Sequence, residues 1–120
     1  MKVIIDTNGL MIPGLFGVDI FSELKRLGFD YFIVLKASVK ELKKISTQAK
    51  GKDKRAAKIA LSLLDRCTII EKNRFVDDAI IDTAAEINAA VLTNDTQLKK
   101  RLCSKGITIV YLREKNHLSI

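Results

Sequence analysis

Five short apolar runs alternate along the chain with segments of helical periodicity, and this alternation limits the possible folds more than any other feature. The runs lie at 2–5, 31–35, 67–70, 90–93 and 107–112. Uninterrupted apolar runs of this length are typical of strands buried on both faces, and helical crossovers between them make the strands parallel. The sequence therefore predicts an α/β fold, a three-layer α/β/α sandwich around a mostly parallel five-stranded sheet. Its 120 residues suit one domain spanning 1–120.

The helices are predicted from apolar positions spaced three or four residues apart. One helix covers 18–27 and ends at Gly28, a second begins at Ser38, and a third passes through Ala57 and Leu64. Two more follow the pair Asp77–Asp78 and the strand at 90–93, the last of them ending at Gly106. The polar stretch 47–54 is predicted as an exposed loop, residues 6–9 as a turn, and the segment from Arg113 as a polar tail.

Neither a membrane span nor a zinc site is expected. No apolar run approaches the roughly 18–20 residues of a membrane helix, and Asp6 ends the first apolar run too early for a signal peptide. We therefore expect a cytoplasmic protein kept at its full length. Cys67 and Cys103 lack metal-ligand spacing and lie in periodic apolar segments, so both are predicted as buried free thiols.

The chain is basic, with a net charge of +7 and an isoelectric point near 9.5. Such a balance favours a polyanionic partner. Basic residues gather in the first half of the chain and again near 99–105, and the candidates for RNA contact are Lys40, Lys43, Lys44, Lys99, Lys100 and Arg101. These clusters are either solvated helix faces or a surface that contacts phosphates, and the sequence leaves both interpretations open.

Four carboxylates follow predicted strands: Asp6 after the first, Glu41 in the helix after the second, Asp78 at the helix after the third, and Asp95 after the fourth. Each has an ordinary structural explanation. Ser38 to Glu41 has the spacing of a capping box, Asp78 and Asp95 are good helix caps, and Asp6 suits a turn. However, the carboxyl ends of parallel strands share one edge of a sheet, where open α/β proteins bind ligands. The four acids are therefore expected to converge.

Converging carboxylates need a cation. A like-charged pair roughly 4 Å apart costs about 1 kcal/mol in water and about 4 kcal/mol at an effective dielectric constant of about 20. Oxygen ligands without histidine favour Mg²⁺ or Mn²⁺. Beside a basic surface, such ions suggest phosphodiester hydrolysis, in which one ion activates water and a second stabilises the leaving oxygen. Thr7, Asn8, Thr93 and Asn94 flank Asp6 and Asp95, and they either orient the acids or simply form turns.

Other chemistries have weaker support. Gly9 and Gly14 have the glycine spacing of a phosphate-binding loop, but no Lys-Ser/Thr pair follows them. An aspartyl phosphotransferase usually carries a second Asp two residues after the first, where this chain has Asn8. The single histidine, His117, lies in the polar tail and is predicted as a surface residue. A Ser-His-Asp arrangement is therefore not supported.

The order of these motifs resembles that of the PIN-domain ribonucleases. The matching segments are 3–8, 39–42, 77–81 and 91–95, continued by 98–102 and 111–113, so the resemblance spans essentially the whole chain. It implies the strand order 3-2-1-4-5 and an Mg²⁺- or Mn²⁺-dependent endonuclease that acts on RNA. It also implies that Asp6, Glu41, Asp78 and Asp95 form the acidic cluster, with Asp82 as an additional ligand and Asp77 as a cap or supporting residue.

Within the family, the chain looks most similar to an archaeal branch that resembles the endonuclease of small-subunit ribosomal RNA processing. A toxin ribonuclease held by an antitoxin shares the same acids and is the first alternative. The second alternative is a non-catalytic RNA-binding module of the same fold. A homodimer and a ribosome-assembly partner are both compatible with the resemblance.

Overall fold

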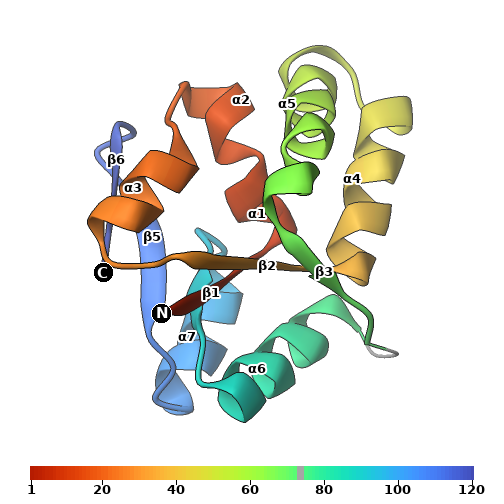
Figure 1. The fold of residues 1–120 in the computed structure, drawn as a ribbon. Helices are drawn as coiled ribbons and strands as arrows, with labels where there is room; N and C mark the ends of the chain where they lie inside the picture. Colours follow the sequence, from red (N-terminus) through yellow and green to blue (C-terminus); the bar gives the residue numbers. More distant parts are fainter. Residues whose placement is uncertain (73–74) are drawn as a thin grey trace.

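The computed structural model describes residues 1–72 and 75–120 (Figure 1), and its centre is a six-stranded sheet in the order β3-β2-β1-β4-β5-β6. The strands are β1 (Lys2–Ile5), β2 (Tyr31–Leu35), β3 (Thr68–Ile70), β4 (Ala90–Leu92), β5 (Ile109–Arg113) and β6 (His117–Ser119). Strands β1 to β5 pair in parallel, so the predicted order 3-2-1-4-5 is confirmed. β6 pairs antiparallel with β5 and makes the sheet mixed.

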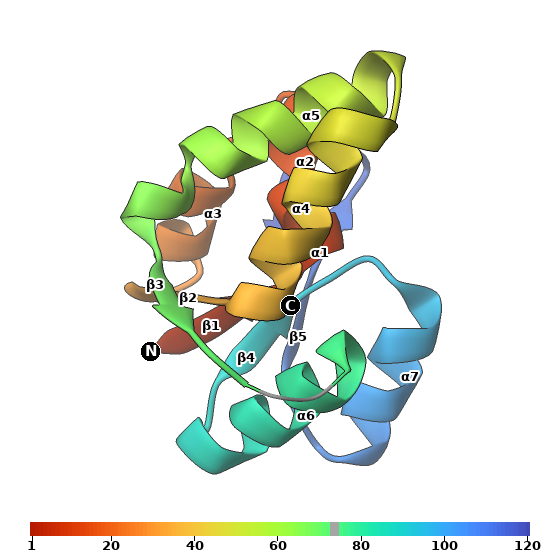
Figure 2. The ribbon, with the colours of Figure 1, turned by 90° about the vertical axis from the view of Figure 1, so that its right-hand side faces the viewer.

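Helices cover both faces of the sheet, as the predicted three-layer sandwich requires (Figure 2). The helices are α1 (Thr7–Leu10), α2 (Ile12–Phe16), α3 (Ile20–Arg26), α4 (Lys36–Gln48), α5 (Gly51–Ser62), α6 (Val76–Ile87) and α7 (Thr96–Ser104), with a 3-10 helix η1 at Leu64–Arg66. α1 to α5 pack on one face, and α6 and α7 pack on the other.

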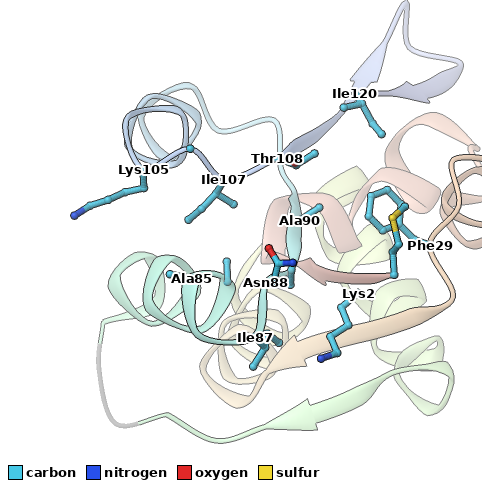
Figure 3. Close-up of a pocket in the computed structure, with 14 residues that line it drawn as sticks. Lys2, Phe29, Ala85, Ile87, Asn88, Ala90, Lys105, Ile107, Thr108 and Ile120 are labelled. Atoms are coloured by element: carbon cyan, nitrogen blue, oxygen red, sulfur yellow. The ribbon is translucent and has the colours of Figure 1, made fainter.

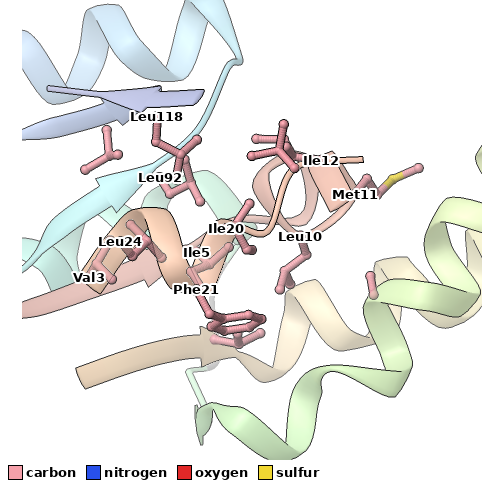
Figure 4. Packing of buried hydrophobic residues seen from close by; sticks show 14 of the residues in the cluster. Val3, Ile5, Leu10, Met11, Ile12, Ile20, Phe21, Leu24, Leu92 and Leu118 are labelled. Atoms are coloured by element: carbon pink, nitrogen blue, oxygen red, sulfur yellow. The ribbon is translucent and has the colours of Figure 1, made fainter. Parts of the chain in front are cut away.

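Successive side chains of the central strands β1, β2 and β4 enter different cores, which explains why these strands are almost entirely apolar. Val3 and Ile5 of β1 join the core beneath α1 to α5, where Phe21 and Leu24 of α3 also lie (Figure 4). Ile4 points the other way, into the core shared with α6 and α7. A parallel strand covered on both faces has no solvent side and needs no polar alternation.

Two predictions for the segment 36–54 were wrong. α4 begins at Lys36, directly after β2, so Ser38 lies inside the helix and does not start it. The predicted loop at 47–54 is largely helical, because α4 continues to Gln48 and α5 starts at Gly51. Its polar residues cover solvent-facing sides of helices, and a polar composition alone does not distinguish such a side from a loop.

The segment predicted as a turn, at 6–9, is the start of a helix. Asp6 is the N-cap of α1, and α2 follows with Pro13 in its first turn. α2 packs closely against α5 at Gly14. A Cβ at this position would lie only 2.5 Å from the Cα of Ala56, so the contact requires glycine. Both helices were missed because each is only one turn long and has no repeating pattern.

The polar tail is also ordered: residues 117–119 form β6, the sixth strand that the prediction lacked. Glu114 and Lys115 take left-handed backbone conformations in the tight connection to β5. Cys103 is exposed, so its predicted burial was wrong, whereas Cys67 is half-buried and both thiols are free. No helix within the described residues has the length and apolar character to cross a membrane.

Candidate active site

The strand order places two of the predicted acids side by side. β1 lies between β2 and β4 at the centre of the sheet. From β1, strands β2 and β3 are added on one side and strands β4 and β5 on the other, so the strand order reverses between β1 and β4. Asp6 follows β1 directly, and Asp95 lies three residues after the end of β4. The backbone N–H of Asp6 donates to the carbonyl of Leu92 at 3.2 Å, which joins the two strand ends. This is the point at which open α/β sheets form a ligand crevice.

Asp6 is buried, with only 5% of its surface exposed, and both carboxylate oxygens accept hydrogen bonds. Oδ1 accepts from the backbone N–H of Gly9 at 2.6 Å, and Oδ2 accepts from the hydroxyl of Thr93 at 2.5 Å. Gly9 has to be glycine here, because a Cβ would lie 2.8 Å from the Leu92 carbonyl oxygen. The cap and the close packing of α1 on β4 therefore fix the carboxylate rigidly.

Thr93 links the two central acids. While its hydroxyl donates to Asp6, the same oxygen accepts from the backbone N–H of Asp95 at 3.0 Å. The Asp95 carboxylate in turn caps α7 by accepting from the N–H of Leu98 at 3.0 Å. The capping role expected of Asp95 is therefore present, and it holds the carboxylate at the edge of the sheet.

A cavity of about 230 Å³ opens at this edge. Its walls carry four carboxylates, two small polar residues and three apolar ones: Asp6, Glu41, Asp77, Asp95, Thr7, Asn8, Met11, Ile45 and Val76. None of the described residues that line it is basic. Of the four acids predicted from the sequence, Asp6, Glu41 and Asp95 meet at this cavity.

Asp77, rather than Asp78, is the acid of α6 that lines the cavity. Asp78 accepts a hydrogen bond at 2.5 Å from Arg101 of α7, and the two side chains are 35% and 50% exposed. Asp82 lies one turn further along α6, and its charge also acts on Arg101. Adjacent residues point about 100° apart around a helix, so the structure favours Asp77 over Asp78 as the α6 member of the site.

Glu41 reaches the cavity from α4, where it is the sixth residue of the helix. It does not form the predicted capping box, because the helix starts two residues before Ser38 and its N-cap is Leu35. Instead, Glu41 Oε1 accepts a hydrogen bond from the hydroxyl of Thr7 at 3.2 Å. This contact connects α4 to the residue next to Asp6.

The electrostatics of the cavity favour the binding of a cation. The pKa of Asp6 is raised from 3.8 to about 7: burial and the nearby carboxylates of Asp95 and Asp77 raise it, and the hydrogen bonds from Thr93 and Gly9 lower it. The pKa of Asp77 is also raised, by burial first and then by Asp95. Burial and like charges both disfavour ionised carboxylates, and a cation between them would reverse this effect.

The donor set fits a hydrated divalent ion. Within residues 1–72 and 75–120, no three Asp, Glu, His or Cys side chains are close enough to hold an ion directly between them. The cavity nevertheless has room for several water molecules, each of which occupies about 30 Å³ in the liquid. Mg²⁺ usually keeps several waters and takes one or two protein carboxylates, so Asp6 and Asp95 with bridging waters suit it.

Asn8 and Asn94 turn their side-chain oxygens toward the backbone. Asn8 Oδ1 accepts from the N–H of Asn94 at 3.3 Å, and Asn94 Oδ1 accepts from the N–H of Leu112 at 2.9 Å. These bonds join the loops after β1 and β4 to β5. Neither amide contacts an acid through a hydrogen bond in the described part of the chain, so their structural role is to hold the loops.

A larger cavity of about 840 Å³ lies at the opposite edge of the sheet, between the ends of α6 and α7 (Figure 3). Its walls include Lys2, Ala85, Ile87 and Ile107, and no acid is among the described residues that line it. Among the described residues, it therefore offers volume without the carboxylates that would hold a divalent metal ion. The smaller cavity is the better candidate for an active site.

The basic residues flank the acidic cavity on two helices. Lys40 and Lys44 lie one turn apart on α4 on either side of Glu41, and both are exposed, as is Lys43. On α7, Lys99 lies one turn after Asp95 with its ammonium 5.0 Å from the centre of the Tyr111 ring, and Lys100 is exposed. Arg101 is the exception, because its guanidinium is paired with Asp78.

These features define a PIN-like domain: a parallel sheet with a central reversal and acids at its carboxyl edge. A family model described as a PIN like domain matches residues 3–115, and the chain belongs to this family.

Two curated relatives are similar to the chain over almost its whole length. Ribonuclease VapC9 of Archaeoglobus fulgidus is 32% identical over 117 residues, which cover 98% of this chain and 87% of that protein. Ribonuclease VapC4 of Methanocaldococcus jannaschii is 30% identical, with 99% and 95% covered. Among solved structures, the PIN domain endonuclease Utp24 superposes with a TM-score of 0.79 at 24% identity, covering 98% of this chain and 88% of that one. The last similarity concerns the fold.

Proposed function

We propose that this PIN-like domain is an endoribonuclease that hydrolyses RNA phosphodiester bonds with Mg²⁺ or Mn²⁺. One observation carries the proposal: Asp6 is buried beside Asp77 and Asp95 in a cavity whose described lining contains no basic residue. Carboxylates in this arrangement are costly unless a cation is bound. The curated relatives, both named ribonucleases, support the choice of RNA as substrate.

The residues have distinct roles in this proposal. Asp6 and Asp95 hold the ion or ions, and Asp77 and Glu41 complete the set of oxygen ligands from the helices. The bound ion supplies the Lewis acid that lowers the pKa of a water and stabilises the leaving oxygen. Thr93 keeps Asp6 and Asp95 aligned, and Thr7 keeps Glu41 turned toward the cavity.

The flanking lysines bring the RNA backbone to the acids. Lys40, Lys43 and Lys44 on one side, and Lys99 and Lys100 on the other, are suited to bind phosphates without reading sequence. Their positive charge also offsets the repulsion between the RNA and the acidic cavity. Structured RNA, with ribosomal RNA as the first to be tested, is the proposed substrate.

The direct test incubates the purified protein with transcribed ribosomal RNA and Mg²⁺ or Mn²⁺. We expect defined cleavage products that disappear with a chelator and in the Asp6→Asn variant. Cleavage of undiminished rate by Asp6→Asn would exclude the assigned site. Tight RNA binding without cleavage in any metal would instead favour the non-catalytic RNA-binding module.

A second candidate is a toxin ribonuclease restrained by an antitoxin, and the similarity to ribonucleases VapC9 and VapC4 favours it. The chemistry is the same, so the two candidates differ in the effect on the cell. A toxin would arrest growth when expressed alone, and Asp6→Asn would relieve the arrest. Harmless expression of an active enzyme would favour RNA processing.

A further inference from the structure

A further cavity of about 470 Å³ adjoins the acidic one and shares with it Asn8, Met11 and Ile45. It lies between α2 on one side and the ends of α4 and α5 on the other. Its remaining walls are Ile12, Leu15, Phe16, Ala49, Asp53 and Asn94. The volume is within the range of roughly 300–1,000 Å³ that small-molecule sites occupy.

The walls of this α2–α4 cavity combine an apolar surface with polar side chains. Met11, Ile12 and Leu15 form the apolar part, and the ring of Phe16 is 41% exposed. An exposed aromatic ring beside a phosphate-binding surface is a platform on which a base can stack.

The two asparagines present donors to the cavity. A backbone N–H can only donate, so the atoms of Asn8 and Asn94 that receive such bonds are the amide oxygens. The amide NH₂ groups are therefore left to bind acceptors of a ligand.

Asp53 provides hydrogen-bond acceptors to the cavity. It belongs to the first turn of α5 and makes no ion pair or side-chain hydrogen bond with any residue in 1–72 or 75–120. Its carboxylate can therefore accept hydrogen bonds from a ligand, and it would repel a phosphate.

We propose that the α2–α4 cavity binds an unpaired guanine of the RNA next to the phosphate that is cleaved; this rests on the proposed function. Among the four bases, guanine has two adjacent donors, N1–H and the N2 amino group, that match both oxygens of a carboxylate, together with acceptors at O6 and N7. Asp53 accepts from the donors, the asparagine amides donate to the acceptors, and Phe16 stacks on the ring.

The polar groups of the cavity allow it to select a base. A polar site rejects a base that lacks the matching groups, because its own polar groups would then stay unpaired. Gly14 of α2 packs closely against Ala56 of α5, which keeps the two helices that carry Phe16 and Asp53 together.

The test measures binding and cleavage separately. Binding uses the Asp6→Asn variant, which cannot cut, and a short single-stranded RNA that contains either one guanosine or one inosine, which lacks the N2 amino group. We expect about tenfold tighter binding of guanosine, and no difference between the two in the Asp6→Asn, Asp53→Asn double variant. The control Asp65→Asn changes an exposed acid of η1, beyond the end of α5, and should keep the difference.

The cleavage experiment uses an RNA pool of random sequence, Mn²⁺ and proteins that keep Asp6. Guanine should be enriched at one fixed position beside the cut, Asp53→Asn should reduce this enrichment, and the control Asp65→Asn should keep it. Equal binding of guanosine and inosine by the protein with Asp53 intact would overturn the inference. If the protein binds guanosine more tightly than inosine but cleaves no RNA, the proposed function is overturned and the guanine site is not.

Discussion

The acidic cavity has an inner half and an outer half that are built differently. Asp6 and Asp95 follow two neighbouring central strands, and both are fixed by backbone N–H groups and by Thr93. Glu41 and Asp77 come from surrounding helices, and within residues 1–72 and 75–120 the Glu41 side chain accepts a hydrogen bond from Thr7 alone. The sheet therefore provides a pair of carboxylates in fixed positions, and the helices add ligands that can adapt to an ion and its waters.

The largest expected effect comes from removing the most buried acid. Asp6→Asn keeps the size and the contact with Gly9 but removes the charge that holds the ion. Because the ion contributes several kcal/mol to the transition state, cleavage should fall on the order of 10³-fold. Single-turnover cleavage with saturating Mn²⁺ measures this, and a fall of less than tenfold would contradict the primary role of the inner half.

The second prediction concerns the stability of the metal-free protein. Since the folded-state pKa of Asp6 is about 7 against 3.8 unfolded, the folded state holds a proton that the unfolded state releases. This contribution is fully present below about pH 4 and is lost as the pH rises through about 7, at most about 4 kcal/mol in total. Denaturant titrations with chelator should show the decline in the natural sequence.

The Asp6→Asn variant provides the control for that experiment. It should lack the decline between about pH 4 and 7 and be the more stable protein at pH 8 without metal. Mn²⁺ should stabilise the natural sequence at pH 8 and leave the variant unchanged. Parallel pH profiles of the two proteins would contradict the assignment of the raised pKa to Asp6.

The third prediction tests whether the Thr93 hydroxyl aligns Asp6 with Asp95 or whether Thr93 only fills space in the core. Thr93→Val removes the hydroxyl between Asp6 and Asp95 and should reduce metal affinity or cleavage by about 10–100-fold. Thr83 of α6 is a matched control, since its buried hydroxyl has no hydrogen-bond partner in the described structure. Thr83→Val should leave cleavage unchanged and should not destabilise the fold. Equal losses in both variants would show that Thr93 acts only through packing.

The smallest expected effect distinguishes two neighbouring acids of the outer half. Asp77→Asn should reduce cleavage by about tenfold, because the side chain lines the cavity. Asp78→Asn should change it less than about threefold, because Asp78 is not among the residues that line the cavity and its half-exposed pair with Arg101 is worth about 0–1 kcal/mol. The reverse ranking would favour the family pattern over the geometry described for α6.

The sequence was sufficient where the backbone alone determines a position. An acid directly after a parallel strand has to lie at the carboxyl edge, so Asp6 and Asp95 could be placed from the strand order. The choice between Asp77 and Asp78 depends on the rotation of α6 about its axis, which packing sets and the pattern of acids does not reveal. Similarly, nothing in the sequence indicated that β2 continues into α4 without a polar cap.

The missed elements had another cause. β6 is stabilised mainly by its partner β5 and by Leu118 in the core, and its neighbours are polar. The helical residues within 47–54, which were predicted as a loop, have mostly polar and charged side chains, and the buried alanines of α5 begin only at Ala56. In both cases tertiary contacts determine the structure, and the local sequence does not reveal these contacts.

The most direct test of the account is a crystal structure grown at about pH 8 with Mn²⁺, in which anomalous scattering locates each ion. The account predicts at least one peak in the cavity, with Asp6 and Asp95 as ligands either directly or through water, and Asp78 still paired with Arg101. A map without a peak there, or with the ion held by residues outside this cavity, would contradict it.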